Sequence, residues 1–466
     1  MKITKNVLMK KTEIYKFFKT NITKIYFYSL IPPLFYILIY NILYYDPILG
    51  YDAEAHYSYV DSFSRYLPRR FRIPLSSETR EFFNPPMAYV FPSAIQVMCR
   101  NFYSADNLLE SCKPIYGNLT QIFQTIMYLF SIYINLLSLK IISAKKFEFY
   151  SISYLLLTML LAVNYRTISM IRGEPYILFF LSLLIYEFVK LENNNFKFKN
   201  LDILKLGLII GCLALSRQWS FLLFPAFFLV IIKIELSSSL NYLKSISKSF
   251  FIGFLISGWF YIYNFFQYGS FIAFNIKKNE INYFDEFNKI FSIENITNNL
   301  FVNPIRPIFD NQLIPILYSD TWGDYWGYFV FTSRFLDVGI DQILIGQFLG
   351  RVNLVSTFTS ILLIIGFFYR SNLNKNPVTI SLLKYFILFS LVGFIWFVIN
   401  YPTSSGDTIK ATYIVQLLNL LAMLGAIFID NIKNNKIYFG IIMALTIVFI
   451  HNFSSFLSKF PIGYPN

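Results

Sequence analysis

Long apolar runs separated by short polar stretches dominate this chain. From about residue 25 to residue 453, runs of mostly apolar residues recur at lengths near 20. An α-helix needs about 20 such residues to cross the hydrocarbon core of a bilayer. The pattern therefore predicts an all-α polytopic membrane protein with about 11 transmembrane helices, in a range of about 10 to 13. The expected spans are 25–44, 119–142, 149–165, 175–189, two segments within 206–232, 250–266, 345–369, 380–399, 412–429 and 438–453.

The run 206–232 is too long for one comfortable span and short for two. Arg217 lies at its middle. A charge near the centre of the bilayer costs at least about 2.5 kcal/mol. Two short helices with Ser216-Arg217-Gln218 at the outer turn avoid this cost, and they are the predicted arrangement.

The charges of the loops predict the orientation. Residues 1–24 contain seven lysines, so they form a basic cytoplasmic N-terminus followed by a retained helix, without a signal-peptide cleavage site. One transmembrane bundle, 25–453, then has external loops 45–117 and 268–341, and the tail 454–466 lies outside. This places the protein in a bacterial inner membrane or an ER membrane. In the first external loop, Asn84-Pro85-Pro86 begins a moderately apolar stretch that predicts a juxtamembrane helix.

Composition agrees with a membrane protein. Hydrophobic residues make up 56% of the chain and charged residues 14%, compared with about 25% charged residues in soluble domains. The net charge of +14 comes with lysines clustered in short loops between apolar runs, which favours cytoplasmic loops over a nucleic-acid partner. Cys99 and Cys112 share the first external loop and can pair if that compartment is oxidising.

The candidate chemistry begins just past the first span. Asp52, Glu54 and His56 follow within five residues, and His56 is one of only two histidines. In a helix, Asp52 and His56 share a face and Glu54 points elsewhere; the simpler explanation is an acidic first helical turn favoured by the helix dipole. The predicted outer face also collects further acids and basic residues, which indicates a site there. They are Arg172, Glu174, Arg217, Asp320, Asp324, Asp407 and Lys410.

Several motifs, in this order, resemble the GT-C glycosyltransferases, in the branch of polyprenyl-phosphate-sugar-dependent enzymes that includes protein O-mannosyltransferases and lipid A aminoarabinose transferases. The acidic motif is followed about thirty residues later by residues 84–89, similar to a helix start in that branch. The other similar segments are 172–175, 215–218, 258–264 with Tyr268-Gly269, 320–326 and, more weakly, 406–410. The resemblance covers roughly residues 25–330. Ala53 separates the two carboxylates, whereas the mannosyltransferases have an adjacent Asp-Glu, so the base is either Asp52 or Glu54, and Asp52 is favoured.

The resemblance implies transfer of a sugar from a polyprenyl-phosphate donor to a hydroxyl of a glycan, lipid or protein acceptor on the periplasmic or lumenal face. The expected catalytic residues are Asp52 and Glu54. A carboxylate can take the acceptor proton, and guanidinium or ammonium groups can stabilise the leaving phosphate. No cofactor is required, and a divalent metal is allowed but not demanded. The expected substrate-binding residues are His56, Arg172, Glu174, Arg217, Trp322, Asp324 and Lys410.

Two other functions compete with this one. A lipid or polysaccharide transporter or flippase predicts charges facing the bundle interior at mid-membrane, often with a repeat of the two halves. A ligase that moves whole glycans from a lipid carrier shares the chemistry but depends on a large late external loop. The aromatic segment 318–329, expected to bind sugar, also fits an interfacial aromatic belt. Charges at span ends on one side favour the glycosyltransferase.

Overall fold

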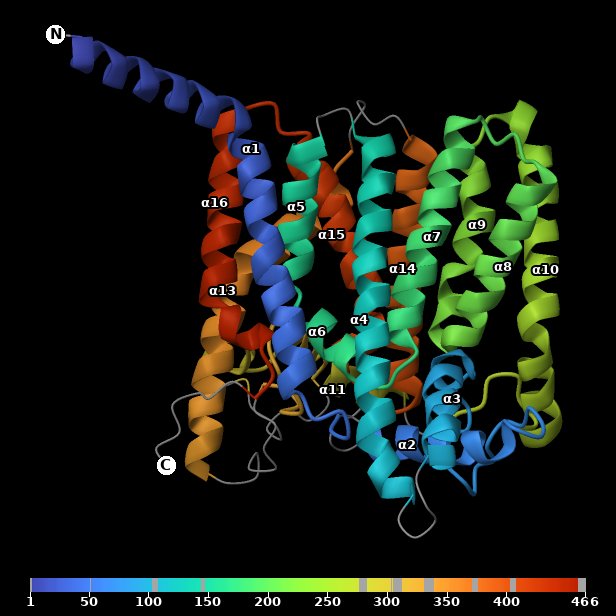
Figure 1. The fold of residues 1–466 in the computed structure, drawn as a ribbon. Coiled ribbons are helices and arrows are strands. Elements are labelled where there is room, and N and C mark those ends of the chain that lie inside the picture. The colour runs from blue at the N-terminus through green and yellow to red at the C-terminus, as the bar shows by residue number, and fades with distance from the viewer. Residues whose placement is uncertain are drawn as a thin grey trace.

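The fold is a bundle of helices (Figure 1). The computed structural model describes residues 2–50, 52–102, 108–143, 147–275, 283–302, 304, 312–330, 339–370, 376–402 and 408–459. These residues contain helices and no strand, which confirms the predicted all-α class. The longer helices are α1 (Lys2–Tyr44), α2 (Ala53–Tyr66), α3 (Met87–Phe102), α4 (Leu108–Ile142), α5 (Phe147–Met159), α6 (Ala162–Ser169), α7 (Glu174–Asn193), α8 (Asn200–Ser216), α10 (Leu236–Tyr268), α11 (Tyr283–Ile290), α12 (Leu313–Trp322), α13 (Gly339–Phe368), α14 (Pro377–Asn400), α15 (Val415–Asp430) and α16 (Asn435–His451).

Six of the described helices contain a stretch long and apolar enough to cross a membrane, and a bent pair adds a seventh. This supports an integral membrane protein. The count of about 11 is not confirmed: α7 is not among these stretches, and α8, the run Gln218–Lys233 and α16 are shorter than 18 residues. The six stretches are Asn21–Tyr44, Cys112–Ile142, Ser238–Tyr268, Gly346–Phe368, Pro377–Asn400 and Ala411–Asp430. Within Ala411–Asp430, which contains α15, 83% of the residues in the 18-residue apolar segment are buried. Helix α15 is therefore a central helix of the bundle.

The bent pair replaces the single span predicted for 149–165. Helices α5 and α6 meet at an angle of 66°. A helix break leaves carbonyl groups without their usual partners, and two side chains of α6 supply donors. Asn164 donates to the carbonyl oxygen of Thr158 at 3.2 Å, and the Tyr165 hydroxyl donates to that of Met159 at 3.0 Å.

The run 206–232 is broken at Arg217, as predicted. Helix α8 ends at Ser216, and Arg217 has an extended backbone with φ −161° and ψ 149°. Three short helices follow: η2 (Gln218–Leu223), α9 (Pro225–Leu229) and η3 (Val230–Lys233). Arg217 therefore lies between two helices rather than inside one.

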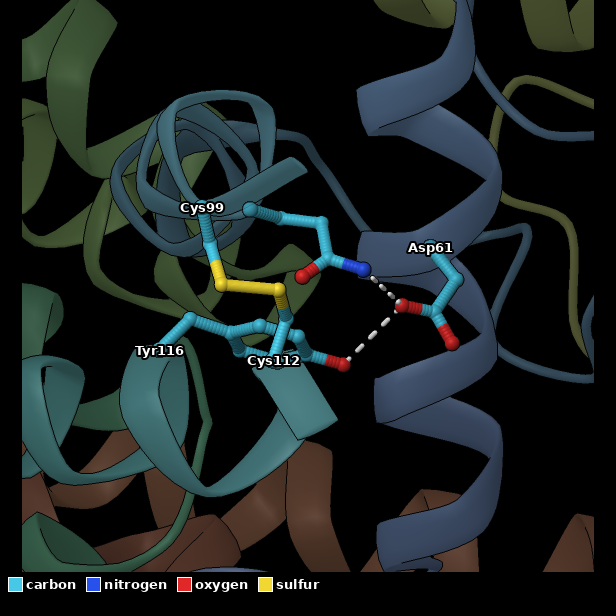
Figure 2. Close-up of a disulfide and its surroundings, with 5 residues drawn as sticks. Asp61, Cys99, Cys112 and Tyr116 are labelled. Carbon is cyan, nitrogen blue, oxygen red and sulfur yellow. Dashed lines mark hydrogen bonds between the residues drawn. A yellow bond between two sulfur atoms is a disulfide. The ribbon is translucent and has the colours of Figure 1, made fainter. Parts of the chain in front are cut away.

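The first predicted external loop folds into α2 and α3, which lie at the end of the bundle opposite the projecting N-terminal part of α1 (Figure 1). Helix α3 begins directly after Asn84-Pro85-Pro86, where the sequence predicts a juxtamembrane helix. A disulfide joins Cys99 of α3 to Cys112 of α4, with 6.1 Å between their Cα atoms (Figure 2). Closing a loop of this length contributes about 3 kcal/mol in the chain-entropy account.

The disulfide lies beside a buried carboxylate that fixes α2 to the same unit. Asp61 of α2 accepts hydrogen bonds from Gln96 Nε2 at 3.0 Å and from the Tyr116 hydroxyl at 3.1 Å (Figure 2). These donors belong to α3 and α4. The three helices are thus tied together, and they hold the start of α2, with Asp52, at a defined place.

Candidate functional site

A polar cavity of about 190 Å³ lies between α2, the segment 80–84, η2 and the segment 408–413. Its wall combines charged, neutral polar and aromatic side chains. Those used below are Asp52, Arg80, Glu81, Asn84, Arg217, Gln218, Trp219, Phe274, Phe397, Thr408, Lys410 and Tyr413. Three residues predicted from sequence, Asp52, Arg217 and Lys410, meet in this cavity although they are far apart in the chain.

Asp52 pairs with Lys410 in the wall of the cavity. Lys410 Nζ donates to Asp52 Oδ2 at 2.9 Å, and the exposed fractions of the two side chains are 37% for Asp52 and 7% for Lys410. Asp52 has a left-handed backbone with φ 55°, and within the described structure its carboxylate makes no hydrogen bond that caps α2. Asp52 directly precedes α2 and Glu54 lies in its first turn, as the acidic-turn explanation expects, and the Asp52 carboxylate is in addition paired with Lys410.

Burial of Asp52 opposes ionisation, but Lys410 and then Arg172 outweigh it and hold the pKa of the Asp52 carboxyl well below its usual range. The carboxylate is therefore ionised at neutral pH.

Asp320 holds the segment that carries Lys410. Its Oδ2 accepts a hydrogen bond from the backbone N–H of Ala411 at 2.7 Å, and its Oδ1 pairs with Arg166 Nη2 at 3.0 Å. The side chains of Asp320 and Arg166 are almost completely buried. Asp320, which the sequence placed on the outer face, thus positions Lys410 rather than lining the cavity among the described residues.

Arg217 is the centre of a buried polar network. Its Nε donates to Glu174 Oε1 at 3.1 Å, its Nη1 lies 3.7 Å from Glu81 Oε2, and Nη1 also donates to Asn84 Oδ1. Burial raises the pKa of the Glu81 carboxyl, and the positive charge of Arg217 offsets part of that rise. Because Glu81 and Arg217 both line the cavity, the network forms one of its walls.

His56 belongs to the same network from behind the wall. The Tyr89 hydroxyl accepts from Asn84 Nδ2 at 3.1 Å and lies 2.7 Å from His56 Nδ1. The Tyr89 hydroxyl therefore links Asn84 to His56, whichever ring nitrogen of His56 carries the proton. Burial, followed by the charges of Arg172 and Arg217, lowers the pKa of His56 well below its usual value. His56 is a neutral member of the network.

The remaining predicted residues lie elsewhere. Glu54 is exposed and lines a separate, open hollow with Arg80. Asp324 is buried and accepts backbone N–H groups of Gly327, Phe329 and Val330 at 2.7–3.1 Å, which shapes its own loop. Trp322 is buried in the main hydrophobic core.

Arg172 is fully buried, and its backbone N–H donates to Gln124 at 3.3 Å. Its charge reaches Asp52 through space. Glu174 is fully buried beside Arg217. Asp407 lies outside the described residues. The catalytic role expected for Glu54 and the substrate-binding roles expected for Trp322 and Asp324 stay predictions that the cavity does not support.

Glu81, Gln218 and Thr408 were missed by the sequence reasoning as site residues. Glu81 precedes the Asn84-Pro85-Pro86 motif by three residues, and Gln218 and Thr408 lie within two residues of the predicted cations Arg217 and Lys410. Their closeness in sequence to these predicted residues was the signal that could have identified them as site residues. Among the described residues, no group of three His, Cys, Asp or Glu side chains is arranged to hold a metal ion.

Comparison with known proteins adds no family: no family model matches the chain, and neither does any curated protein. The likeness to GT-C enzymes thus depends on the motifs alone.

We predict that Arg217→Met lowers the free energy of unfolding by about 3–5 kcal/mol, because it leaves buried carboxylates without their cation. Adding Glu174→Gln should recover part of this loss, since it removes one of those charges. Thermal unfolding of the purified protein in detergent measures both effects. Arg351→Met, at an exposed position of α13, is the control and should change little; equal melting temperatures for Arg217→Met and wild type would contradict the network.

Proposed function

We propose that this protein is an integral-membrane glycosyltransferase that moves a sugar from a polyprenyl-phosphate donor to an acceptor hydroxyl, with Asp52 as the general base. The observation that carries the proposal is the cavity in which an accessible, ionised carboxylate lies 2.9 Å from Lys410 and shares a wall with Arg217. One base and two cations around a single cavity are the groups that this reaction requires.

In the proposed reaction, the acceptor hydroxyl gives its proton to a carboxylate oxygen of Asp52. The acceptor oxygen forms a bond to the anomeric carbon of the sugar while the bond from that carbon to the phosphate oxygen breaks. The electron pair of the broken bond leaves with the polyprenyl phosphate, whose added negative charge is stabilised by Arg217 and Lys410. The proton ends on Asp52 and the sugar on the acceptor, so charge and atoms balance without a cofactor.

A second, apolar cavity supports a lipid-linked donor. Its wall is formed by α8, η2, α10 and the segment 271–272, with aromatic side chains such as Phe221, Phe224 and Tyr261. Segments of the chain that line the polar cavity, at Gln218 and Phe274, continue into this apolar wall at Phe221 and Phe271. A ligand with a charged head and a long hydrocarbon tail fits two such neighbouring cavities.

The orientation of the protein is part of the proposal: the N-terminus is cytoplasmic, and the polar cavity opens toward the periplasm or ER lumen. Disulfides persist in oxidising compartments and are rare in the cytosol. The Cys99–Cys112 bond, on the same helices that position Asp52, therefore supports an external active site. The basic residues 1–24 support a cytoplasmic N-terminus.

We predict that Asp52→Asn lowers the transfer rate by about 10²- to 10⁴-fold, the range that general-base catalysis supplies. Glu54→Gln should lose less than about tenfold, because Glu54 faces a separate hollow. Release of radiolabelled sugar from synthetic polyprenyl-phosphate sugars measures both rates. Glu235→Gln, an exposed carboxylate before α10, is the matched control. Full activity of Asp52→Asn with every donor would contradict the assignment of Asp52 as the general base.

The pH dependence tests the Asp52–Lys410 pair separately. Asp52 acts as a base only when ionised, so activity is lost as the pH falls through its pKa, which Lys410 holds well below the usual range. Lys410→Met removes the cation and leaves the burial, so the pKa of Asp52 rises and the acid limb of the kcat/KM profile should move to higher pH. Lys410→Arg keeps the charge and should keep the limb. Identical acid limbs for Lys410→Met and wild type would contradict the pairing.

The disulfide tests the orientation. In sealed cells or vesicles of known sidedness, a membrane-impermeant maleimide should label Cys99 and Cys112 from the external side only after treatment with an impermeant reductant. Mass spectrometry of the labelled peptides reads the result. A Cys99→Ala, Cys112→Ala double variant controls for reaction at Cys212, which lies in α8. Labelling only after the membrane is opened would reverse the proposed topology, whereas external labelling without reductant would contradict the disulfide.

A further inference from the structure

Two buried polar atoms in the wall of the polar cavity have hydrogen-bonding capacity that no described residue meets. They are Gln218 Oε1 and Thr408 Oγ1. The residues are 6% and 3% exposed. Buried polar groups in folded proteins are almost always paired, because an unpaired one retains the full cost of its desolvation. Gln218 and Thr408 both line the same cavity, which makes a ligand bound there a candidate partner for these two atoms.

The chemistry that Gln218 can recognise is fixed by its surroundings. Its Nε2 donates to the carbonyl oxygens of Phe83 at 2.8 Å and of Ala273 at 3.2 Å, which uses both amide hydrogens. A flipped amide would place an oxygen against two carbonyl oxygens, so the orientation is settled by the network. Oε1 is therefore a fixed acceptor, and its partner has to be a donor such as a hydroxyl or an amine. A phosphate oxygen does not fit.

Aromatic side chains line the same cavity as Gln218. Trp219 is partly buried and lines the cavity, with its ring centroid 4.7 Å from that of Phe397 and 5.5 Å from that of Tyr413. Packing against these rings fixes the indole. An apolar ring surface together with a few fixed polar groups is the usual construction of a small-molecule site, and a sugar ring offers C–H faces and hydroxyl donors to match it.

The wall of the polar cavity contains both cations and neutral hydrogen-bonding side chains. Gln218 directly follows Arg217, and Thr408 precedes Lys410 by two residues. Arg217 and Lys410, the two cations assigned to the phosphate, thus each have a neutral hydrogen-bonding residue close by in the same wall, whereas the third cation, Arg80, is next to Glu81. Cations suit the phosphate, and the neutral groups suit the part of the donor next to it, which is the sugar.

We infer that Gln218, Thr408 and Trp219 form the subsite for the transferred sugar, and that Gln218 Oε1 selects donors whose sugar presents a hydroxyl or amine to it. The inference rests on the proposed function, because it assigns the sugar end of a lipid-linked donor. It makes Gln218 a determinant of sugar specificity.

The first test measures binding by the purified full chain in detergent, by thermophoresis. The probes are sugar-free polyprenyl phosphate and polyprenyl-phosphate glucose, mannose, galactose, N-acetylglucosamine and arabinose with one lipid length. Gln218→Met and Thr408→Val should each weaken the sugar-bearing lipid that wild type prefers by about tenfold, the effect of one hydrogen bond. Binding of the sugar-free lipid should stay within about twofold.

Two control variants make the same changes outside the cavity. Gln121 Oε1 and Thr359 Oγ1 are also buried without a partner among the described residues, and neither lines the polar cavity as described. Gln121→Met and Thr359→Val should leave the dissociation constants of both kinds of lipid unchanged. Their unfolding curves, compared with those of the cavity variants, report any general loss of structure.

The second test pairs each variant with deoxy analogues of the preferred sugar. Removal of one hydroxyl should cost wild type about tenfold in affinity and Gln218→Met almost nothing, the signature of a direct partner in a double-mutant cycle. Equal weakening of sugar-bearing and sugar-free lipids, or the absence of coupling between Gln218 and every hydroxyl, would overturn the subsite. If wild type neither binds these lipids nor releases sugar from them, the proposed function itself fails. Wild-type transfer with unaffected variants overturns the subsite alone.

Discussion

The buried guanidinium of Arg217 is the constraint on which the site depends. The exposed fraction of Arg217 is 5%. The residue lies where three segments meet: the start of α7 with Glu174, the loop with Glu81 and Asn84, and the start of η2. Removing an ion from water costs several kcal/mol unless opposite charges and hydrogen bonds replace the solvent. The three segments therefore stay together only in the arrangement that surrounds this one cation. The same arrangement brings the first external loop against the bundle and creates a wall of the cavity.

Asp52 and Lys410 form a separate pair of charges in the wall of the cavity, and this pair differs from the Arg217 network in exposure. The Arg217 network is enclosed, so its geometry is fixed and its partners suit a structural role as much as a chemical one. The Asp52 carboxylate is 37% exposed, so water or a substrate hydroxyl can reach it. Of the two carboxylates in the cavity, Asp52 is thus the one placed to exchange a proton, while Glu81 is held by Arg217 and Asn84.

The parts of this protein that the sequence predicts well are those set by local physics. Apolar runs predict helices, and the cost of a central charge predicts the break at Arg217. The break between α5 and α6 was not predicted, because the apolar pattern runs through it without Gly or Pro; it depends on the donors of Asn164 and Tyr165 in α6. Asp52, Arg217 and Lys410 could be found from motifs and loop charge. Gln218 adjoins Arg217, but the orientation of its amide could not be predicted, because it depends on carbonyl oxygens of Phe83 and Ala273, which are distant in sequence.

The two charge pairs also suggest how the proposed reaction is ordered. In the free protein, Lys410 is bound to Asp52 and lowers its pKa, which makes the carboxylate a weak base. A donor phosphate in the cavity is a second anion for the same ammonium group, and a shared cation lowers the pKa of each partner less. In the proposed reaction, Asp52 therefore becomes a stronger base when the leaving group is in place. Under this proposal, the acceptor hydroxyl is activated only beside a bound donor, and an unproductive proton transfer in the empty site is disfavoured.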